Sequence, residues 1–206
     1  SRKNGIASRA SVSIPLKSCA IIEARLTGVN AVTTSTAAIR ANATGTPAAD
    51  ASPSSTVAVE DLCGLLPKSD IERITGYKAG QVDDHKGPEF LHFCTIYVNV
   101  PDCGGNCALS LEDLGALDGK TNNDAQSYRQ TLIDVNADYE PVFMDSGVGG
   151  DSWLATFTAG DAEGIKILYF NNGDVAFGLT SPRIKGGAVT EDQMIDLAEV
   201  ALAAAQ

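Results

Sequence analysis

The cysteines carry most of the chemistry that can be expected of this chain. There are five of them, and the last four fall within a stretch of about 45 residues: Cys19, Cys63, Cys94, Cys103 and Cys107. Cysteines placed so closely act as a redox couple, as metal ligands or as disulfides. The residues between them help to decide among these three roles.

Cys103 and Cys107 enclose a Gly-Gly-Asn turn. A thioredoxin-type couple has two intervening residues and its first thiol at a helix N-terminus, so this pair does not match it. A zinc site needs additional ligands, and His92 is close enough in the sequence to supply one. Disulfides, which are typical of exported proteins, are the favoured interpretation, with zinc as the alternative.

Position along the chain suggests how the cysteines pair. We expect Cys63 to bond to Cys94, linking the first helix to the first long strand, and Cys103 to bond to Cys107, closing the turn. By the loop-entropy estimate the longer link contributes about 3–4 kcal/mol and the shorter one less. Cys19 is then left over, either as a lipidated cysteine or as a free or intermolecular thiol.

One further motif could also indicate a catalytic site. The sequence Gly-Asp-Ser-Trp-Leu at 150–154 imitates the Gly-Asp-Ser-x-Leu block of a hydrolase class, in which a downstream histidine helps to activate the serine. Here the candidate is Ser152, but His85 and His92 both lie upstream and no βα unit supports the serine. We therefore predict no catalytic residues, and no cofactor or metal site.

Charge is distributed unevenly over the 206 residues. Residues 1–56 hold six Lys or Arg against two Asp or Glu, a net +4, whereas residues 57–206 hold nine against twenty-four, a net −15. An acidic body repels the phosphate backbone, so nucleic-acid binding is not expected. The sequence contains no apolar run long enough to span a bilayer.

Composition divides the chain into two regions. The first aromatic residue is Tyr77, and the stretch 33–56 consists almost wholly of Ala, Ser, Thr, Pro, Gly and Asn. Such a composition cannot bury enough apolar area to offset the entropy of ordering. We predict an N-terminal segment and tether over 1–56 and a globular domain over 57–206.

Periodicity in the second region predicts both helices and strands. Helical spacing occurs at 61–77, from Asn122 or Asn123 to about 137, and at 191–205, with capping boxes beginning at Asn123 and Thr190. Strand patterns occur at 89–100, 152–158, 164–170 and 174–180. The prediction is an α+β domain: an antiparallel meander sheet covered on one face by helices, stapled by disulfides, with an extended N-terminal tail.

Three motifs in this region resemble a known family. They are DLCGLLPKSDIERITG at 61–76, FCTIYV at 93–98 and SGVGGDSWLATF at 146–157, followed by an amphipathic helix. Together they resemble secreted actinobacterial lipoproteins, of mycobacterial and corynebacterial type, that carry a domain of unknown function. The resemblance covers about residues 60–205 and does not include the Cys103–Cys107 pair. It implies a cell-envelope location and no established chemistry.

These observations lead to one expected function and one alternative. We expect a non-catalytic extracytoplasmic binding or accessory protein of the cell envelope, at the outer face of the plasma membrane, that docks on a membrane protein assembly through its N-terminal segment. Its partner would be an envelope or membrane protein, and a tether or that partner would hold it at the membrane. The alternative is an envelope hydrolase that uses Ser152 with His85 or His92.

Overall fold

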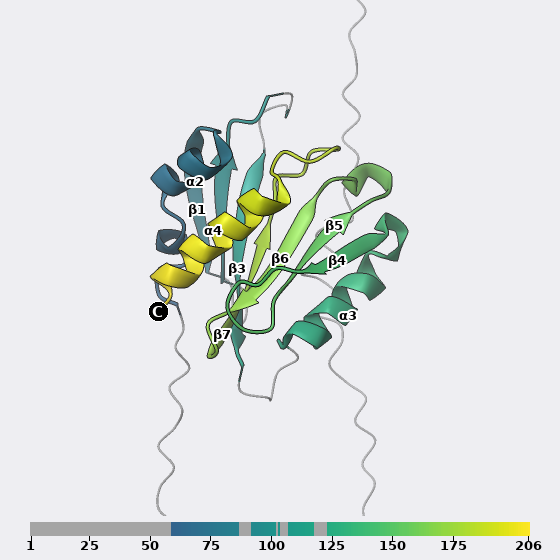
Figure 1. The fold of residues 1–206 in the computed structure, drawn as a ribbon. Coiled ribbons are helices and arrows are strands. Elements are labelled where there is room, and N and C mark those ends of the chain that lie inside the picture. Colours follow the sequence, from purple (N-terminus) through teal and green to yellow (C-terminus); the bar gives the residue numbers. More distant parts are fainter. Residues whose placement is uncertain (1–58, 87–91, 102, 104–106, 118–122) are drawn as a thin grey trace, which may run out of the picture. The chain divides into compact units, whose positions relative to one another are not determined.

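A seven-stranded antiparallel sheet forms the centre of the domain (Figure 1). The computed structural model describes residues 59–86, 92–101, 103, 107–117 and 123–206. The predicted segment and tether at 1–56, and Cys19, lie outside these residues and stay predictions. The strands are β1 Ala79–Lys86, β2 His92–Val98, β3 Ala108–Ala116, β4 Pro141–Asp145, β5 Trp153–Phe157, β6 Lys166–Asn171 and β7 Val175–Thr180.

The strand order joins two meanders along one seam. It runs β1-β2-β3-β7-β6-β5-β4, so β1 to β3 form one meander and β4 to β7 form the other. The seam is the antiparallel pairing of β3 with β7, in which Leu111 lies opposite Leu179. Between β3 and β4 the chain passes to the far edge of the sheet and forms a helix on the way, α3 Ala125–Val135.

The two faces of the sheet are covered by different helices. One face packs against η2 Cys63–Leu65, α2 Lys68–Thr75 and α4 Glu191–Ala204, and Figure 1 shows α4 crossing the strands diagonally beside α2. Because side chains alternate along a strand, this face carries Leu154, Leu168 and Leu179, which lie side by side across the sheet. The other face carries Trp153 and Tyr169, and α3 packs there through Tyr128.

The main core lies on the α4 side. It is built from aliphatic and aromatic residues of β2, β3, β6 and β7 together with η2, α2 and α4: Leu62, Leu66, Ile71, Ile96, Leu109, Leu111, Leu168, Phe170, Phe177, Leu179, Met194 and Leu197. All of these are almost completely buried. The aromatic residues Trp153, Phe157, Phe170 and Phe177 of β5, β6 and β7 are also buried.

Local capping signals explain where the helices begin and end. α2 ends at Gly76, whose φ of 75° is the left-handed conformation that glycine adopts at little cost. α4 begins with the predicted capping box, in which Thr190 Oγ1 accepts from the Gln193 amide and Gln193 Oε1 accepts from the Thr190 amide. The capping box predicted from Asn123 is wrong, because the Asp124 side chain caps α3 instead.

The α+β prediction is therefore confirmed, with an antiparallel sheet stapled by disulfides. α3 adds a helix on the second face, and two short 3₁₀ segments, η3 Ala137–Tyr139 and η4 Gly160–Ala162, flank β4 and β5. Strands β1, β3 and β4 were not predicted from the sequence. Within the described residues, no helix is long and apolar enough to cross a membrane.

Candidate functional site

A groove of about 750 Å³ lies between α3 and the segment from β4 to the start of β5. Its volume is in the range of small-molecule binding sites. One wall consists of the α3 residues Ala125, Gln126, Arg129, Gln130 and Ile133. The opposite wall consists of Phe143, Met144, Asp145, Gly150, Asp151, Ser152 and Trp153.

The α3 wall follows from helical spacing. Gln126, Arg129, Gln130 and Ile133 stand at positions i, i+3, i+4 and i+7, which form one stripe along a helix. The stripe on the opposite side of α3 carries Tyr128 and Leu132, which are buried against the sheet. Burial of that side therefore turns the two glutamines and the arginine outward, into the groove.

The start of α3 is held by Asp124. Its Oδ1 accepts hydrogen bonds from the Gln126 and Ser127 amides at 3.1 and 2.9 Å, and its Oδ2 accepts from Ser127 Oγ at 2.7 Å. These bonds stabilise the ionised form, so the pKa of the Asp124 carboxyl lies below its usual value. A negative charge is thereby placed at the helix N-terminus, where the helix dipole favours it.

Aromatic rings form the floor of the groove. Trp153 is stacked on Tyr169 with ring centroids 5.6 Å apart, and it also contacts Tyr128 and the edge of Phe143. Trp153 Nε1 donates a 2.8 Å hydrogen bond to the carbonyl oxygen of Ala125, the first residue of α3. The floor is therefore tied directly to the helical wall and holds its geometry.

The opposite wall is a glycine-rich loop anchored on β6. Asn171 Nδ2 donates to the carbonyl oxygen of Asp151 at 2.9 Å, and Gly149 forms an isolated bridge with Asn171. Gly149 has a φ of 74°, and a Cβ there would collide with the carbonyl oxygen of Asn171. The close approach requires glycine, so the loop is built to lie against this strand.

The groove carries charges of both signs. The Arg129 guanidinium lies 4.3 Å from the centroid of the Phe143 ring, a cation–π arrangement, while Asp145 and Asp151 are exposed on the facing wall. Below them, burial raises the pKa of the Tyr169 phenol to about 12, and the nearby charges of Asp124 and Asp151 add to this effect. Tyr169 is thus a neutral hydrogen-bond donor at every physiological pH.

Two hydroxyls in the loop lack hydrogen-bond partners in the described part of the chain. They belong to Ser146 and Ser152, and both oxygens are buried. A buried hydroxyl without a hydrogen-bond partner destabilises the folded state. Such groups are uncommon in native proteins. The loop that forms this wall therefore contains two hydroxyl groups, of Ser146 and Ser152, that can still form hydrogen bonds.

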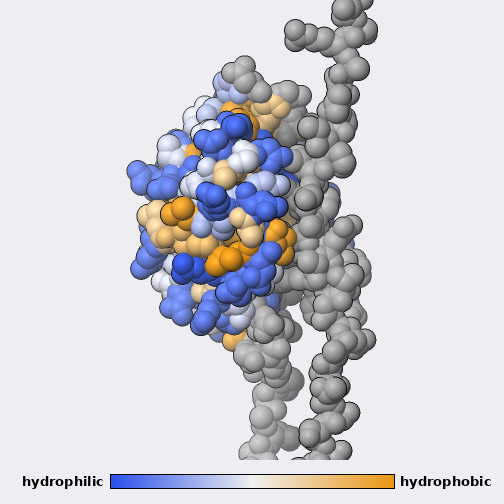
Figure 2. Space-filling model, turned by 90° about the vertical axis from the view of Figure 1, so that its right-hand side faces the viewer, coloured by the Kyte–Doolittle hydropathy of each residue, from blue (hydrophilic) through white to orange (hydrophobic). Residues whose placement is uncertain are grey.

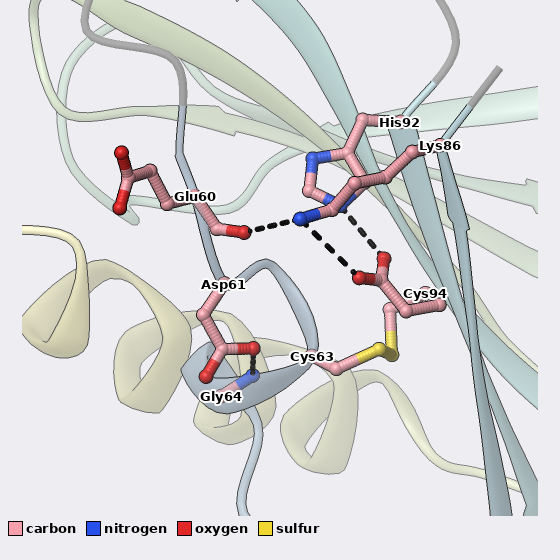
Figure 3. A network of polar contacts seen from close by, with 8 residues as sticks. Glu60, Asp61, Cys63, Gly64, Lys86, His92 and Cys94 are labelled. Carbon is pink, nitrogen blue, oxygen red and sulfur yellow. Dashed lines mark hydrogen bonds and ion pairs between the residues drawn. A yellow bond between two sulfur atoms is a disulfide. The ribbon is translucent and has the colours of Figure 1, made fainter.

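The predicted cysteine pairs are both disulfides. Cys63 of η2 bonds to Cys94 of β2, with Cα atoms 5.2 Å apart, and Cys103 bonds to Cys107, with Cα atoms 5.9 Å apart. Both separations are usual for disulfides. Figure 3 shows the first bond joining the 3₁₀ turn to the sheet. The pairing prediction is confirmed, and the bonds indicate an oxidising environment.

His92 belongs to a polar cluster beside the first disulfide (Figure 3). Its Nε2 lies 2.7 Å from Asp84 Oδ1, and Lys86 Nζ lies 3.6 Å from the other oxygen of the same carboxylate. Lys86 also donates to the carbonyl oxygen of Glu60 at 2.7 Å. These contacts fasten the start of the domain to β1 and β2, which is a structural role.

The structure separates the residues of the alternative hydrolase site. Ser152 precedes β5, while His92 and His85 lie on β2 and β1. Strands β3, β7 and β6 stand between β2 and β5, and four strand spacings amount to about 19 Å. His85 in addition lies on the opposite face from His92, stacked on Phe93. A hydrogen bond from Ser152 to either histidine is therefore impossible in this arrangement.

The residues of the zinc alternative are separated as well. The amide of Val98 at the end of β2 donates to the carbonyl oxygen of Cys107, whereas His92 begins that strand. Six residues of extended chain correspond to about 20 Å. In the described ranges, no group of three or more His, Cys, Asp or Glu side chains converges as a metal site would require.

Comparison with protein-family models, with curated protein sequences and with solved structures finds no match to this chain. The resemblance to actinobacterial lipoproteins therefore depends on the short motifs alone. The groove was not indicated by the sequence. Its walls come from residues 125–133 and 143–153, and of these the sequence analysis singled out only part of the second wall, as a family motif at 146–157 and as a hydrolase-like block at 150–154.

Proposed function

We propose that this chain is an extracytoplasmic binding or accessory protein of the cell envelope. The observation that carries the proposal is the groove between α3 and the 145–152 loop, which offers hydrogen-bonding and aromatic groups and is lined by no histidine. The two disulfides support an oxidising compartment. Together they favour recognition outside the cytoplasm over catalysis.

We further propose that the N-terminal segment holds the domain at the membrane. Residues 1–56 carry a net +4 and include Cys19, and residues 57–206 carry a net −15. A basic segment favours an anionic membrane surface or an acidic partner, whereas the acidic body is repelled by both. Attachment through this segment leaves the groove free for a ligand.

Fractionation of the native cells tests the compartment. The protein is isolated without reductant, after alkylation of free thiols, and its peptides are mapped. We expect the full chain in the envelope fraction, with Cys63 bonded to Cys94 and Cys103 bonded to Cys107. Recovery of the chain in the cytosol with these four thiols alkylated would contradict the proposal.

Membrane attachment is tested with three variants of the full chain. Deletion of residues 1–32 should release the protein from the membrane fraction, whereas replacement of 33–56 by a Gly-Ser stretch of equal length should not. Cys19→Ser separates the two means of attachment, because it releases a lipid-anchored protein and leaves a partner-bound one in place. Retention of the deletion variant would show that attachment resides in the domain.

A further inference from the structure

We propose that the groove binds a neutral saccharide. This inference rests on the proposed binding function and adds the chemical class of the ligand. Three properties of the groove support it: the kinds of hydrogen-bonding groups on its two walls, the balance of charge between them, and the apolar surface at its floor.

The walls present donors and acceptors in facing sets. On α3 stand Gln126 and Arg129, whose planar side chains each offer several N–H groups, and on the other wall stand the carboxylates of Asp145 and Asp151. A sugar hydroxyl donates one hydrogen bond and accepts others, so neighbouring hydroxyls can be bound by both walls at once. Planar groups with paired atoms suit such neighbouring hydroxyls because two bonds form in one plane.

The balance of charge disfavours an anionic ligand. Arg129 contributes one positive charge, and Asp145 and Asp151 contribute two negative ones. Asp124 adds a further carboxylate at the start of α3. A phosphate or uronate would meet a surplus of negative charge. An uncharged, hydroxyl-rich ligand avoids this penalty and can still bond to the guanidinium and the carboxylates.

The floor provides the apolar contact that a sugar ring needs. Phe143, Ile133 and Met144 supply the apolar surface between the polar walls, and Trp153, which is 5% exposed, also lines the groove. Met144 is 43% exposed. Figure 2 views the molecule from the side on which β4 and α3 lie, and patches of apolar residues lie there among hydrophilic ones. Binding sites for polar ligands combine aromatic surface with a few placed polar groups in this way.

Trp153 makes the test direct, because it is the only tryptophan of the chain and lines the groove. The full-length, oxidised protein is titrated with short neutral oligosaccharides of glucose, mannose, galactose, arabinose and N-acetylglucosamine. An oligogalacturonide and an uncharged-side-chain tripeptide are titrated in parallel. Tryptophan emission and calorimetry are both recorded. We expect saturable binding of at least one neutral oligosaccharide, and weaker or no binding of the other two probes.

Variants locate the binding. Arg129→Ala should weaken the binding about tenfold or more, since it removes charge-assisted hydrogen bonds. Asp145→Asn keeps the oxygen that accepts from the Gly147 amide, so it should weaken binding without unfolding the loop. Lys68→Ala is the matched control: it also removes one exposed positive charge, but from α2, which packs on the other face of the sheet. Its affinity should equal that of the natural chain.

The outcomes are distinct. Absence of saturable binding to every neutral oligosaccharide at millimolar concentration overturns the saccharide inference, as does preferred binding of the tripeptide or the oligogalacturonide. Equal affinity in Arg129→Ala and the natural chain places the binding elsewhere and also overturns it. The thiol map reports separately on the proposed function: disulfides in the envelope without sugar binding refute only the ligand class.

Discussion

The phenol of Tyr169, in the middle of β6, donates a 2.8 Å hydrogen bond to the carbonyl oxygen of Asn123, immediately before α3. This bond connects the centre of the sheet to the entry of the helix that forms one wall of the groove. Tyr169→Phe should cost about 1–2 kcal/mol of unfolding free energy, because the carbonyl oxygen loses its buried donor. Urea denaturation at pH 7 measures it.

The same side chain predicts a pH dependence. Burial raises the pKa of Tyr169 in the folded protein to about 12, against about 10 in the unfolded chain. The folded state therefore keeps a proton that the unfolded state loses, and stability falls as pH rises from about 10 to 12. Tyr169→Phe should flatten this alkaline loss, so that the two stability curves approach each other above pH 10. If the two stability curves stay parallel above pH 10, the alkaline loss does not come from Tyr169.

Two glycines of the groove loop permit a matched comparison. Gly147 and Gly149 have φ values of 70° and 74°, so alanine is strained at both. A Cβ at Gly147 meets nothing within 4 Å, whereas one at Gly149 collides with the Asn171 carbonyl oxygen. Gly147→Ala should cost about 1 kcal/mol and Gly149→Ala at least twice as much. Equal losses in thermal denaturation would mean that the loop does not depend on this contact.

The two disulfides should differ in their contribution to stability. Cys63 and Cys94 are 31 residues apart, and Cys103 and Cys107 are four apart. On the loop-entropy model, removal of the first bond by Cys63→Ala with Cys94→Ala costs about 3–4 kcal/mol. Removal of the second by Cys103→Ala with Cys107→Ala costs about 2 kcal/mol. Denaturant midpoints of the two double variants compare them, and the reverse order would contradict the model.

Lys166 predicts a pH dependence of stability that is opposite in sign to that of Tyr169. Its side chain is largely buried beside the carbonyl oxygen of Gly164, and burial lowers its pKa, an effect partly offset by Glu191. The unfolded chain thus holds the proton at pH values where the folded protein has lost it, so stability rises with pH between the lowered pKa and 10.5. Lys166→Met should remove this rise and add about 1 kcal/mol at pH 7. A loss of stability at pH 7 would indicate that the ammonium group is needed.

The elements that the sequence predicted correctly are those with local signals. Gly76 ends α2 and the Thr190–Gln193 box begins α4, because each depends on neighbouring residues only. β1 escaped prediction because Ala-Gly-Gln-Val-Asp-Asp-His-Lys has weak strand preference and forms an edge strand by pairing with β2. In β3 a signal was present: Leu109 and Leu111 alternate with Ser110 and Glu112.

The disulfide pairing could be predicted from the sequence, whereas the groove could not. The pairing of Cys63 with Cys94 could be argued from which elements the cysteines occupy. The groove could not, since Arg129 and Asp145 are brought together only by the return of the chain from α3 to the edge strand β4. The spacing of residues along the sequence does not predict that return of the chain. A polar stripe on α3 indicates only an exposed helix face.

The seam between the two meanders bears on how the chain is made. Leu111 on β3 finds its partner Leu179 on β7 only after the second meander has been synthesised, and the face that both share is covered by α4, the last helix. Contacts between such distant segments slow folding. A nascent chain that stops before Thr190 would contain every strand of the sheet yet lack the cover of its main core. Folding of the domain is therefore expected to wait until α4 has been synthesised.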